Sequence, residues 1–410
     1  MQLLEGALRT YAWGSRTAIA ELCGRPVPSN HPEAEVWLGA HPADPARLLG
    51  GADPVSLLEA VDADPAGQLG DRARAEFGDR LPFLLKLLAA EEPLSLQAHP
   101  SAIQAKEGFQ REEAAGIPLD SPVRNYRDDS HKPELVVALT RFEVLAGFRD
   151  PHRTIELLRA LEVPALDHYI ALLAGQPDSS GLRALFTTWI TLPPPALEAL
   201  LPQILEGCVR YLSGGPGARA YTAELRTVLG LGESYPGDAG VLASLLLNRI
   251  TLQPGEGLYV AAGNLHAYLH GLAVEVMANS DNVLRGGLTP KHVDVPELLR
   301  VLDFEPLTGP VLTPSAVPGA ATVVYETPAP EFALTRVDLD RSGDRHPASV
   351  EFELAGPRIL LCTSGAVTLR SGGKILELEQ GGAAWIAASD PEFVAVARTS
   401  TAQVFSAAVG

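Results

Sequence analysis

Cysteine is scarce in this chain, which has three cysteines among 410 residues. Cys23, Cys208 and Cys362 are odd in number and far apart, so they do not suggest the disulfide framework of a small secreted domain. The first residues carry no basic flank and no small-residue cleavage site, so no signal peptide is apparent. Together these absences predict a protein of the reducing cytoplasm.

Long apolar runs and an excess of positive charge are also missing. No uninterrupted apolar stretch approaches the roughly 20 residues that a membrane-spanning helix requires. Lys and Arg number 32 against 50 Asp and Glu, which gives a formal net charge of −18 without any basic block. We therefore expect no nucleic-acid partner and no membrane partner. An anionic substrate would have to be held by locally placed cations.

The composition, 46% hydrophobic and 20% charged, is that of a globular protein, and the length suits roughly two to three domains. Much of the chain consists of short apolar segments separated by Pro, Gly, Asp or Asn. This pattern favours a β-sandwich or barrel over a βαβ sheet. The segments are residues 81–88, 94–99, 135–139, 142–148, 258–262 and 272–278.

The middle of the chain has helical periodicity instead. Apolar residues recur at i, i+3, i+4, i+7 and i+8 in residues 182–190 and again in 197–205, which predicts two amphipathic helices. Residues 155–161 and 241–247 also look helical. Glycine-rich loops are expected at 214–217 and 230–240.

Beyond residue 310 the chain returns to short alternating strands, which predict a second β-sandwich. The expected strands are residues 332–339, 350–354, 359–362, 366–370 and 393–397. This region contains one histidine, His346, and so cannot repeat a site built from several histidines. The sequence thus predicts a mainly β fold with an α-helical insertion and a metal-free second β domain.

The segment 94–99 carries the first candidate metal ligands. Gln97 and His99 lie two residues apart, and residues at i and i+2 of a strand point to the same face. Glu134 stands where a polar loop enters an apolar strand, and a buried carboxylate needs a cation or a metal beside it. Imidazole, carboxylate and amide oxygen together suit a borderline metal such as zinc.

A further histidine ligand could come from the segment 264–270, which offers both His266 and His270 around Tyr268. Periodicity alone does not decide between the two histidines.

Residues 274–291 place one carboxylate, Glu275, in an apolar strand and follow it with a polar loop that carries Arg285 and Lys291. One interpretation is a structural loop with a buried Glu275–Arg285 pair. The other is the edge of a pocket, where a cation is supplied to a phosphate or to a developing oxyanion.

Taken together, these motifs resemble the type I mannose-6-phosphate isomerases, a zinc-dependent cupin family. The resemblance covers residues 1–148 and 255–304 well, whereas the helical block and the C-terminal region match only in order and size. The matching segments are residues 11–15, 34–42, 81–86, 94–100, 131–134, 142–143, 147–149, 263–271 and 274–299.

The resemblance implies a fold and a division into domains. The catalytic, metal-binding domain would be a cupin-type β-sandwich or jelly roll formed by residues 1–148 and 251–305. A helical domain would occupy residues 149–250, and a metal-free cupin-like β domain residues 311–410.

The resemblance also implies one Zn²⁺ per subunit, held by Gln97, His99, Glu134 and His266, which selects His266 over His270. Arg285 would be the cation that stabilises the transition state. Lys132 and Glu275 would line the same pocket. The phosphate and sugar contacts would be Ser95, Lys86 and Lys291.

The implied reaction interconverts D-mannose 6-phosphate and D-fructose 6-phosphate through a zinc-assisted enediolate. It requires a base that moves a proton between C2 and C1, and both Lys132 and Glu275 qualify. The partner is a small sugar phosphate, and the protein would be a monomer or a small homo-oligomer. The alternatives are a non-catalytic zinc cupin that binds a sugar phosphate and a metal-dependent oxygenase, although oxygenases favour histidine-rich iron sites.

Overall fold

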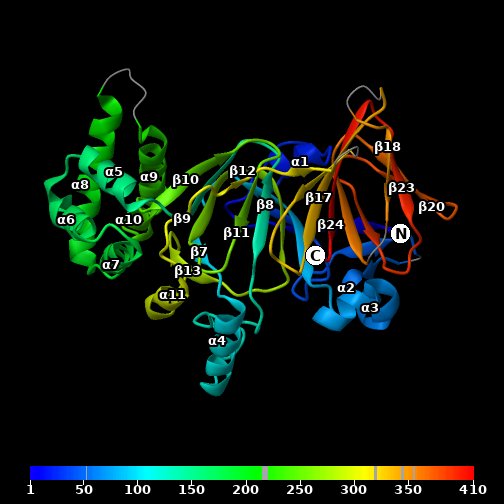
Figure 1. Ribbon diagram of the computed structural model, residues 1–410, viewed down its shortest axis with the longest axis horizontal. Coiled ribbons are helices and arrows are strands. Elements are labelled where there is room, and N and C mark those ends of the chain that lie inside the picture. The colour runs from blue at the N-terminus through cyan, green and yellow to red at the C-terminus, as the bar shows by residue number, and fades with distance from the viewer. Residues whose placement is uncertain (52, 215–219, 318–320, 343–345, 354–355) are drawn as a thin grey trace.

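The computed structural model describes every residue except 52, 215–219, 318–320, 343–345 and 354–355. Figure 1 shows three regions side by side: a bundle of helices at one end, a β-sandwich in the middle and a second set of strands at the other end. Helices α5 to α10 form the bundle, and the strands after β14 form most of the far end. A mainly β fold with a helical insertion, as expected from the sequence, is confirmed.

The middle region, called here the first sandwich, has two layers that share one long strand, β12 (His266–Ala278). Layer one runs β14-β11-β8-β12-β6-β3-β2, and layer two runs β10-β9-β12-β7-β13. The other strands are β2 (Ala7–Arg9), β3 (Glu35–Leu38), β6 (Phe83–Ala90), β7 (Leu96–Ala98), β8 (Glu134–Ala138), β9 (Phe142–Phe148), β10 (Leu247–Leu252), β11 (Gly257–Val260), β13 (Leu284–Gly287) and β14 (Val311–Leu312).

Strand β12 passes from one layer to the other at a corner near Gly271. Its first arm pairs with β9 and β7, and its second arm pairs with β6 and β8. Gly271 has φ +125°, and a Cβ there would lie 2.6 Å from the carbonyl oxygen of Arg141. Only glycine tolerates that backbone conformation in such close contact. The corner therefore brings the two ends of β12 back to the same end of the sandwich.

Both outer faces of the first sandwich are covered. Residues such as Leu87, Val137 and Val274 of layer one pack in one core with Trp385 and Phe405 of the C-terminal region. The outer face of layer two packs against the helices. Because both faces are buried, the strands read as nearly continuous apolar runs, and inward polar residues stand out against them.

The helical region contains α5 (Pro151–Ala160), η1 (Pro164–Leu166), α6 (Asp167–Gly175), α7 (Ser179–Ile190), α8 (Pro194–Ser213), α9 (Thr222–Ser234) and α10 (Gly240–Ser244). The helices predicted at 182–190 and 197–205 are confirmed as parts of α7 and α8. The loop predicted at 230–240 is wrong in its first half, because Gly230 and Gly232 lie inside α9, whose tertiary packing overrides the low helix propensity of glycine. Of the loop predicted at 214–217, residues 215–217 lie outside the described part of the chain.

The C-terminal region forms a second sandwich, in which a long sheet faces a short one. The long sheet runs β15 (Ser315–Ala316), β16 (Thr322–Tyr325), β17 (Ala333–Asp340), β24 (Thr401–Ala408), β19 (Arg358–Ser364), β22 (Ala383–Ile386), β1 (Gln2–Glu5), β4 (Arg47–Leu49) and β5 (Val55–Ser56). The short sheet runs β18 (Ser349–Phe352), β23 (Phe393–Ala397), β20 (Val367–Ser371) and β21 (Lys374–Leu378). Three N-terminal strands thus complete a sheet made otherwise by the end of the chain.

The remaining helices are α1 (Ala18–Leu22), α2 (Leu57–Ala63), α3 (Pro65–Phe77), α4 (Ala102–Ala114) and α11 (Val295–Val301). In the described part of the chain, none of the helices has the length and apolar character that crossing a membrane would require. The strands predicted at 142–148 and 393–397 are confirmed as β9 and β23. Of the strand predicted at 350–354, residue 354 lies outside the described part of the chain.

Candidate metal centre

Three side chains that are remote in the sequence meet between the two layers of the first sandwich. His99 follows β7, Glu134 begins β8 and His266 begins β12. One possible ligand atom from each lies within 4.8 Å of those of the other two. Glu134 Oε1 is 3.3 Å from His99 Nε2, and Glu134 Oε2 is 3.4 Å from His266 Nε2. All three residues are buried.

Strand alternation explains why these side chains point inward. In β7 the neighbours Leu96 and Ala98 are buried in the helical core, so Gln97 projects from the opposite face, toward the interior of the sandwich. Leu265, just before β12, and Ala267 in β12 pack in the same helical core, which turns His266 to the interior. Packing against the helical region therefore fixes the direction of the candidate ligands through the residues beside them.

Hydrogen bonds set the tautomers of the two histidines. The Nδ1 of His99 lies 2.9 Å from the carbonyl oxygen of Asn282, and the Nδ1 of His266 lies 3.1 Å from that of Asn264. A ring nitrogen that faces a carbonyl oxygen carries the proton, so each Nε2 keeps a free lone pair aimed at Glu134. The Nε2 of His99 is buried and has no hydrogen-bond partner. A buried ring nitrogen that has a free lone pair and no hydrogen-bond partner is suited to bind a metal ion.

The protonation states of this cluster also suit a cation. Burial lowers the pKa of His99, and the neighbouring Glu134 offsets only part of that effect, so the imidazole stays neutral. Burial alone would raise the pKa of Glu134, but the surrounding cationic and hydrogen-bonding groups, the Lys132 ammonium among them, outweigh it and hold the pKa well below its usual value. A neutral His99 and an ionised Glu134 are the forms in which these two groups bind Zn²⁺.

Gln97 lies beside this cluster. It is the register partner of His266 on one side and of Arg285 on the other. Its amide nitrogen donates a hydrogen bond to Ser95 Oγ over 3.3 Å, which leaves the amide oxygen as the available acceptor. Gln97, Glu134 and His266 line one cavity of about 70 Å³. That volume holds an ion with about two waters.

A buried ion-pair network forms another side of the cavity. Lys86 Nζ is 2.9 Å from Glu275 Oε2 and 3.7 Å from Glu35 Oε1. Tyr268 donates a hydrogen bond to Glu275 Oε1 over 2.8 Å, and the indole of Trp37 donates one to Glu35 over 2.6 Å. The partner of Glu275 is therefore Lys86, and the buried Glu275–Arg285 pair considered from the sequence does not form.

Burial would lower the pKa of Lys86, but Glu275 and Glu35 outweigh it and raise that pKa, so the ammonium remains charged. Burial raises the pKa of Glu275, and the proximity of Lys86 counters only part of the increase. A buried carboxylate with a raised pKa is a more effective proton acceptor once it is ionised.

The other expected cations lie around the same centre. Lys132 Nζ is 3.3 Å from Glu134 Oε1. Arg285 follows Leu284, which is buried in the helical core, so Arg285 projects from the opposite face, as Gln97 does. Burial and the nearby Arg127 lower the pKa of Arg285. Burial, then Arg285 and Arg127, lower the pKa of Lys291, so these three residues form one cationic group.

His270 lies outside the metal cluster. The pairing of β12 with β9 shifts register between Tyr268 and His270, and this irregularity turns His270 to the exposed surface. Without the shift, His266, Tyr268 and His270 would all face the interior. The sequence could not reveal the shift, which is why periodicity left the choice between the histidines open.

Several site residues escaped the sequence analysis. Glu35, Trp37 and Asn282 complete the network around Lys86 and His99, and Arg127 joins the cationic group. Glu35 and Trp37 lie in the motif at 34–42, so a signal was present, but nothing in the chain marked their proximity to Lys86.

Three comparisons bear on this site. The family model "Phosphomannose isomerase type I, catalytic domain" matches residues 1–151. Mannose-6-phosphate isomerase of Escherichia coli K12 is 38% identical over 409 residues, which cover 99% of this chain and 100% of the relative. A lysine-to-alanine variant of phosphomannose isomerase from Salmonella typhimurium superposes with a TM-score of 0.89 at 35% identity, covering 99% of this chain and 98% of that one. A zinc-bound mannose 6-phosphate isomerase has a TM-score of 0.87 at 35% identity, covering 98% of both chains.

Proposed function

Because the chain belongs to the type I phosphomannose isomerase family, we propose that its reaction takes place at the cluster of His99, Glu134 and His266. The chain is a zinc-dependent isomerase that interconverts mannose 6-phosphate and fructose 6-phosphate. The observation that carries this assignment of the site is the buried, unpartnered Nε2 of His99 beside an ionised Glu134. The function of a non-catalytic sugar-phosphate binder is not favoured.

One Zn²⁺ per subunit would be held by Gln97, His99, Glu134 and His266. The ligand types, the two histidine tautomers and the shared cavity support this set. When bound, the ion supplies Lewis-acid polarisation of the sugar oxygens at C1 and C2, which is worth several kcal/mol in general cases.

The chain's own residues would move the proton between C2 and C1. Glu275 is the favoured base, because it lies in the cavity as a carboxylate with a raised pKa. Tyr268 and Lys86 hold its two oxygens in place. Lys132 is the second candidate; its ammonium lies 3.3 Å from Glu134 and would have to lose a proton before it could act as the base.

The cationic group would hold the charged parts of the substrate. Arg285 faces the same interior as Gln97, so it is placed to stabilise the negative charge of the enediolate. Lys291, at the solvent side of Arg285, would contact the phosphate, and Ser95 and Lys86 would contact the sugar. The small cavity accommodates the ion but not a whole hexose phosphate, so most of the sugar would lie between it and the cationic group.

We also propose the division into residues 1–148 with 251–305, 149–250 and 311–410. The strand pairing supports it in outline, although β1, β4 and β5 join the C-terminal sheet and β14 joins the first sandwich. The remaining proposals are a cytoplasmic location, a monomer or small homo-oligomer, and no nucleic-acid partner. The first rests on the cysteine usage and the last on the net charge of −18.

The test is an assay of the interconversion of the two sugar phosphates, with and without a chelator. Turnover that disappears on chelation and returns with added Zn²⁺ supports the proposal. Stoichiometric zinc and tight substrate binding without turnover would instead identify a binding protein. Consumption of oxygen would identify an oxygenase.

A further inference from the structure

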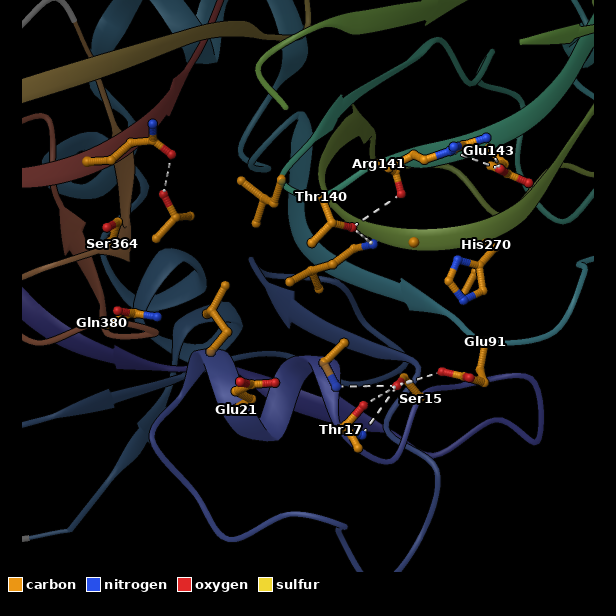
Figure 2. A pocket seen from close by; sticks show the side chains of 18 residues that line it. Ser15, Thr17, Glu21, Glu91, Thr140, Arg141, Glu143, His270, Ser364 and Gln380 are labelled. Carbon is orange, nitrogen blue, oxygen red and sulfur yellow. Dashed lines mark hydrogen bonds and ion pairs between the residues drawn. The ribbon is translucent and has the colours of Figure 1, made fainter. Parts of the chain in front are cut away.

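A second, larger pocket of about 840 Å³ lies between the first and second sandwiches (Figure 2). One side is formed by the turn after β8 and by the corner of β12. A second side consists of α1 and the residues before it, and a third comes from the ends of β19, β21 and β24. A volume of this size is within the range of small-molecule binding sites.

This pocket is separate from the metal centre. Strand β8 begins with Glu134 at the metal centre and ends at Ala138, and the pocket is lined by the residues that follow, Leu139 and Thr140. The corner of β12 lines the pocket, whereas its two arms carry His266 and Glu275 back to the metal centre. The two cavities share no lining residue among those described. They therefore occupy opposite ends of the first sandwich.

Four polar side chains from different elements line this pocket without a partner of their own. Figure 2 shows Glu21 on α1, Ser364 and Gln380 on the side of the second sandwich, and His270 on the opposite side. Within the described residues, no side-chain hydrogen bond or ion pair engages any of the four. They offer a carboxylate, a hydroxyl, an amide and an imidazole, which together can donate and accept hydrogen bonds.

The charge of the pocket argues against an anionic ligand. Its one arginine, Arg141, lies 3.0 Å from Glu143, which Arg249 also binds at 2.5 Å, so these three groups together keep a single positive charge. Glu91 accepts a hydrogen bond from Ser15 over 2.9 Å but has no cationic partner in the described chain, and the same holds for Glu21. The field left in the pocket is negative and opposes a phosphate. The net charge of the pocket therefore disfavours a second sugar-phosphate site here.

The same pocket also presents aliphatic surface. Leu22, Leu139 and Leu272 lie among the polar groups. The residues that follow Leu272 in β12 are buried. A sugar ring offers hydroxyl groups at its edge and C–H groups on its faces, which matches a lining of mixed polar and aliphatic groups. Among the described lining residues none is Phe, Tyr or Trp, so stacking on a large aromatic ring is not available and the affinity must come mainly from hydrogen bonds and aliphatic contacts.

We propose that this pocket binds an uncharged carbohydrate of one or two rings, with Glu21, Ser364 and Gln380 as hydrogen-bonding partners. The site is independent of the isomerase reaction, since it lies beyond the corner of β12. Because each hydrogen bond to an uncharged sugar at a water-exposed site contributes little net free energy, the dissociation constant is expected in the millimolar range.

The experiment is saturation-transfer NMR on the zinc-loaded protein with trehalose as the probe. Trehalose has two rings, no charge and no reducing end, so it is not an isomerase substrate. Spectra are recorded first without and then with saturating fructose 6-phosphate, which fills the active site. Transfer to trehalose that persists under these conditions supports the proposal. Loss of transfer when fructose 6-phosphate is added would place the sugar in the active site and overturn it, as would the absence of transfer at any soluble concentration.

Variants locate the binding. Glu21→Ala and Gln380→Ala should each weaken trehalose binding by about threefold or more, which is the scale of one lost hydrogen bond. The matched controls Glu76→Ala on α3 and Gln110→Ala on α4 replace exposed residues of the same types outside the pocket, and they should leave the affinity unchanged. Equal loss in pocket and control variants would contradict the proposal.

Two further measurements test the size and the charge of the site. Ser364→Trp places an indole in the pocket and should abolish trehalose binding while isomerase turnover stays normal, which also reports that the protein is folded. Glucuronate at low ionic strength should bind several-fold more weakly than methyl glucoside, because Glu21 and Glu91 repel its carboxylate. Equal binding of the two sugars would overturn the inference of a site for uncharged carbohydrate.

Discussion

Lys86 and Glu275 are direct register partners in the antiparallel pair of β6 and β12, and their side chains meet with Nζ 2.9 Å from Oε2. Both side chains are buried, with relative exposures of 6% and 2%. Two charges in such a place must compensate each other, and removal of one partner from a buried pair generally costs about 3–5 kcal/mol. The pair therefore fixes the position of the carboxylate that faces the metal centre.

Replacing Glu275 with Gln should lower kcat sharply while zinc remains bound. The amide keeps the shape of the side chain and a hydrogen bond from Tyr268, but it cannot accept the proton, and loss of a general base generally costs about 10²–10⁴-fold in rate. Steady-state kinetics and metal analysis check this. Lys132→Met serves as the comparison, because the larger loss of kcat identifies which of the two residues carries the proton. Exposed Glu107→Gln is the control and should leave kcat unchanged.

His99→Ala and Glu134→Ala should each lose zinc and activity. Each substitution removes one of the three groups that converge within 4.8 Å, and the others cannot complete the ligand set. His270→Ala is a matched control, because His270 belongs to the same strand as His266 but faces the surface. Metal content after dialysis and turnover are the measurements. Stoichiometric zinc in both ligand variants, or zinc loss in the His270 variant, would contradict the assigned centre.

The sequence was sufficient for those features that depend on local pattern. The alternation in 94–99 predicted that Gln97 and His99 share a face, and the structure places Leu96 and Ala98 on the other face, in the helical core. The apolar periodicity of 182–190 and 197–205 predicted α7 and α8. Both features arise within a few residues of chain, where the periods of strands and helices apply directly.

Other features depend on contacts that no local pattern contains. The proximity of Glu35 to Lys86 requires β3 to pair with β6, and the addition of β1 to the C-terminal sheet requires the two ends of the chain to meet. The surface position of His270 depends on a register irregularity in β12. The family resemblance selected His266, but the physical reason for that choice emerged only from the pairing of the strands.

Arg285→Ala should lower kcat by about 100- to 1000-fold, the usual effect of removing one group that stabilises a developing oxyanion. The substitution should lower kcat but leave the zinc content nearly unchanged, because Arg285 lies beside Gln97 and is not one of the three clustered residues. Exposed Arg226→Ala, on α9, is the control for a general loss of positive charge. An unchanged kcat in the Arg285 variant would remove this residue from the mechanism.

The stability of the metal-free protein should fall as the pH drops below about 6.5, the usual pKa of an unfolded histidine. Burial lowers the pKa of His99 in the folded state, so the unfolded chain binds more protons below that pH. Above about pH 6.5 the neutral His99 makes its full contribution to the free energy of unfolding. That contribution is lost as the pH falls. Urea unfolding of chelator-treated protein at several pH values measures the slope. The His99→Gln variant should show a smaller slope over the same range, and an equal slope would assign the effect to other groups.

Gly271→Ala should destabilise the protein and reduce zinc binding together. An alanine at φ +125° is strained by about 1–3 kcal/mol, and its Cβ would also approach the carbonyl oxygen of Arg141 to 2.6 Å. The corner cannot then keep the two arms of β12 in register, and those arms carry His266 and Glu275. Gly230→Ala is the matched control: Gly230 lies within α9 with open space around its Cα, so alanine there should stabilise the protein by about 0.5–1 kcal/mol. Chemical unfolding and zinc titration of both variants separate the two effects. A Gly271 variant as stable and as zinc-replete as the parent would show that the corner does not control the geometry of the metal centre.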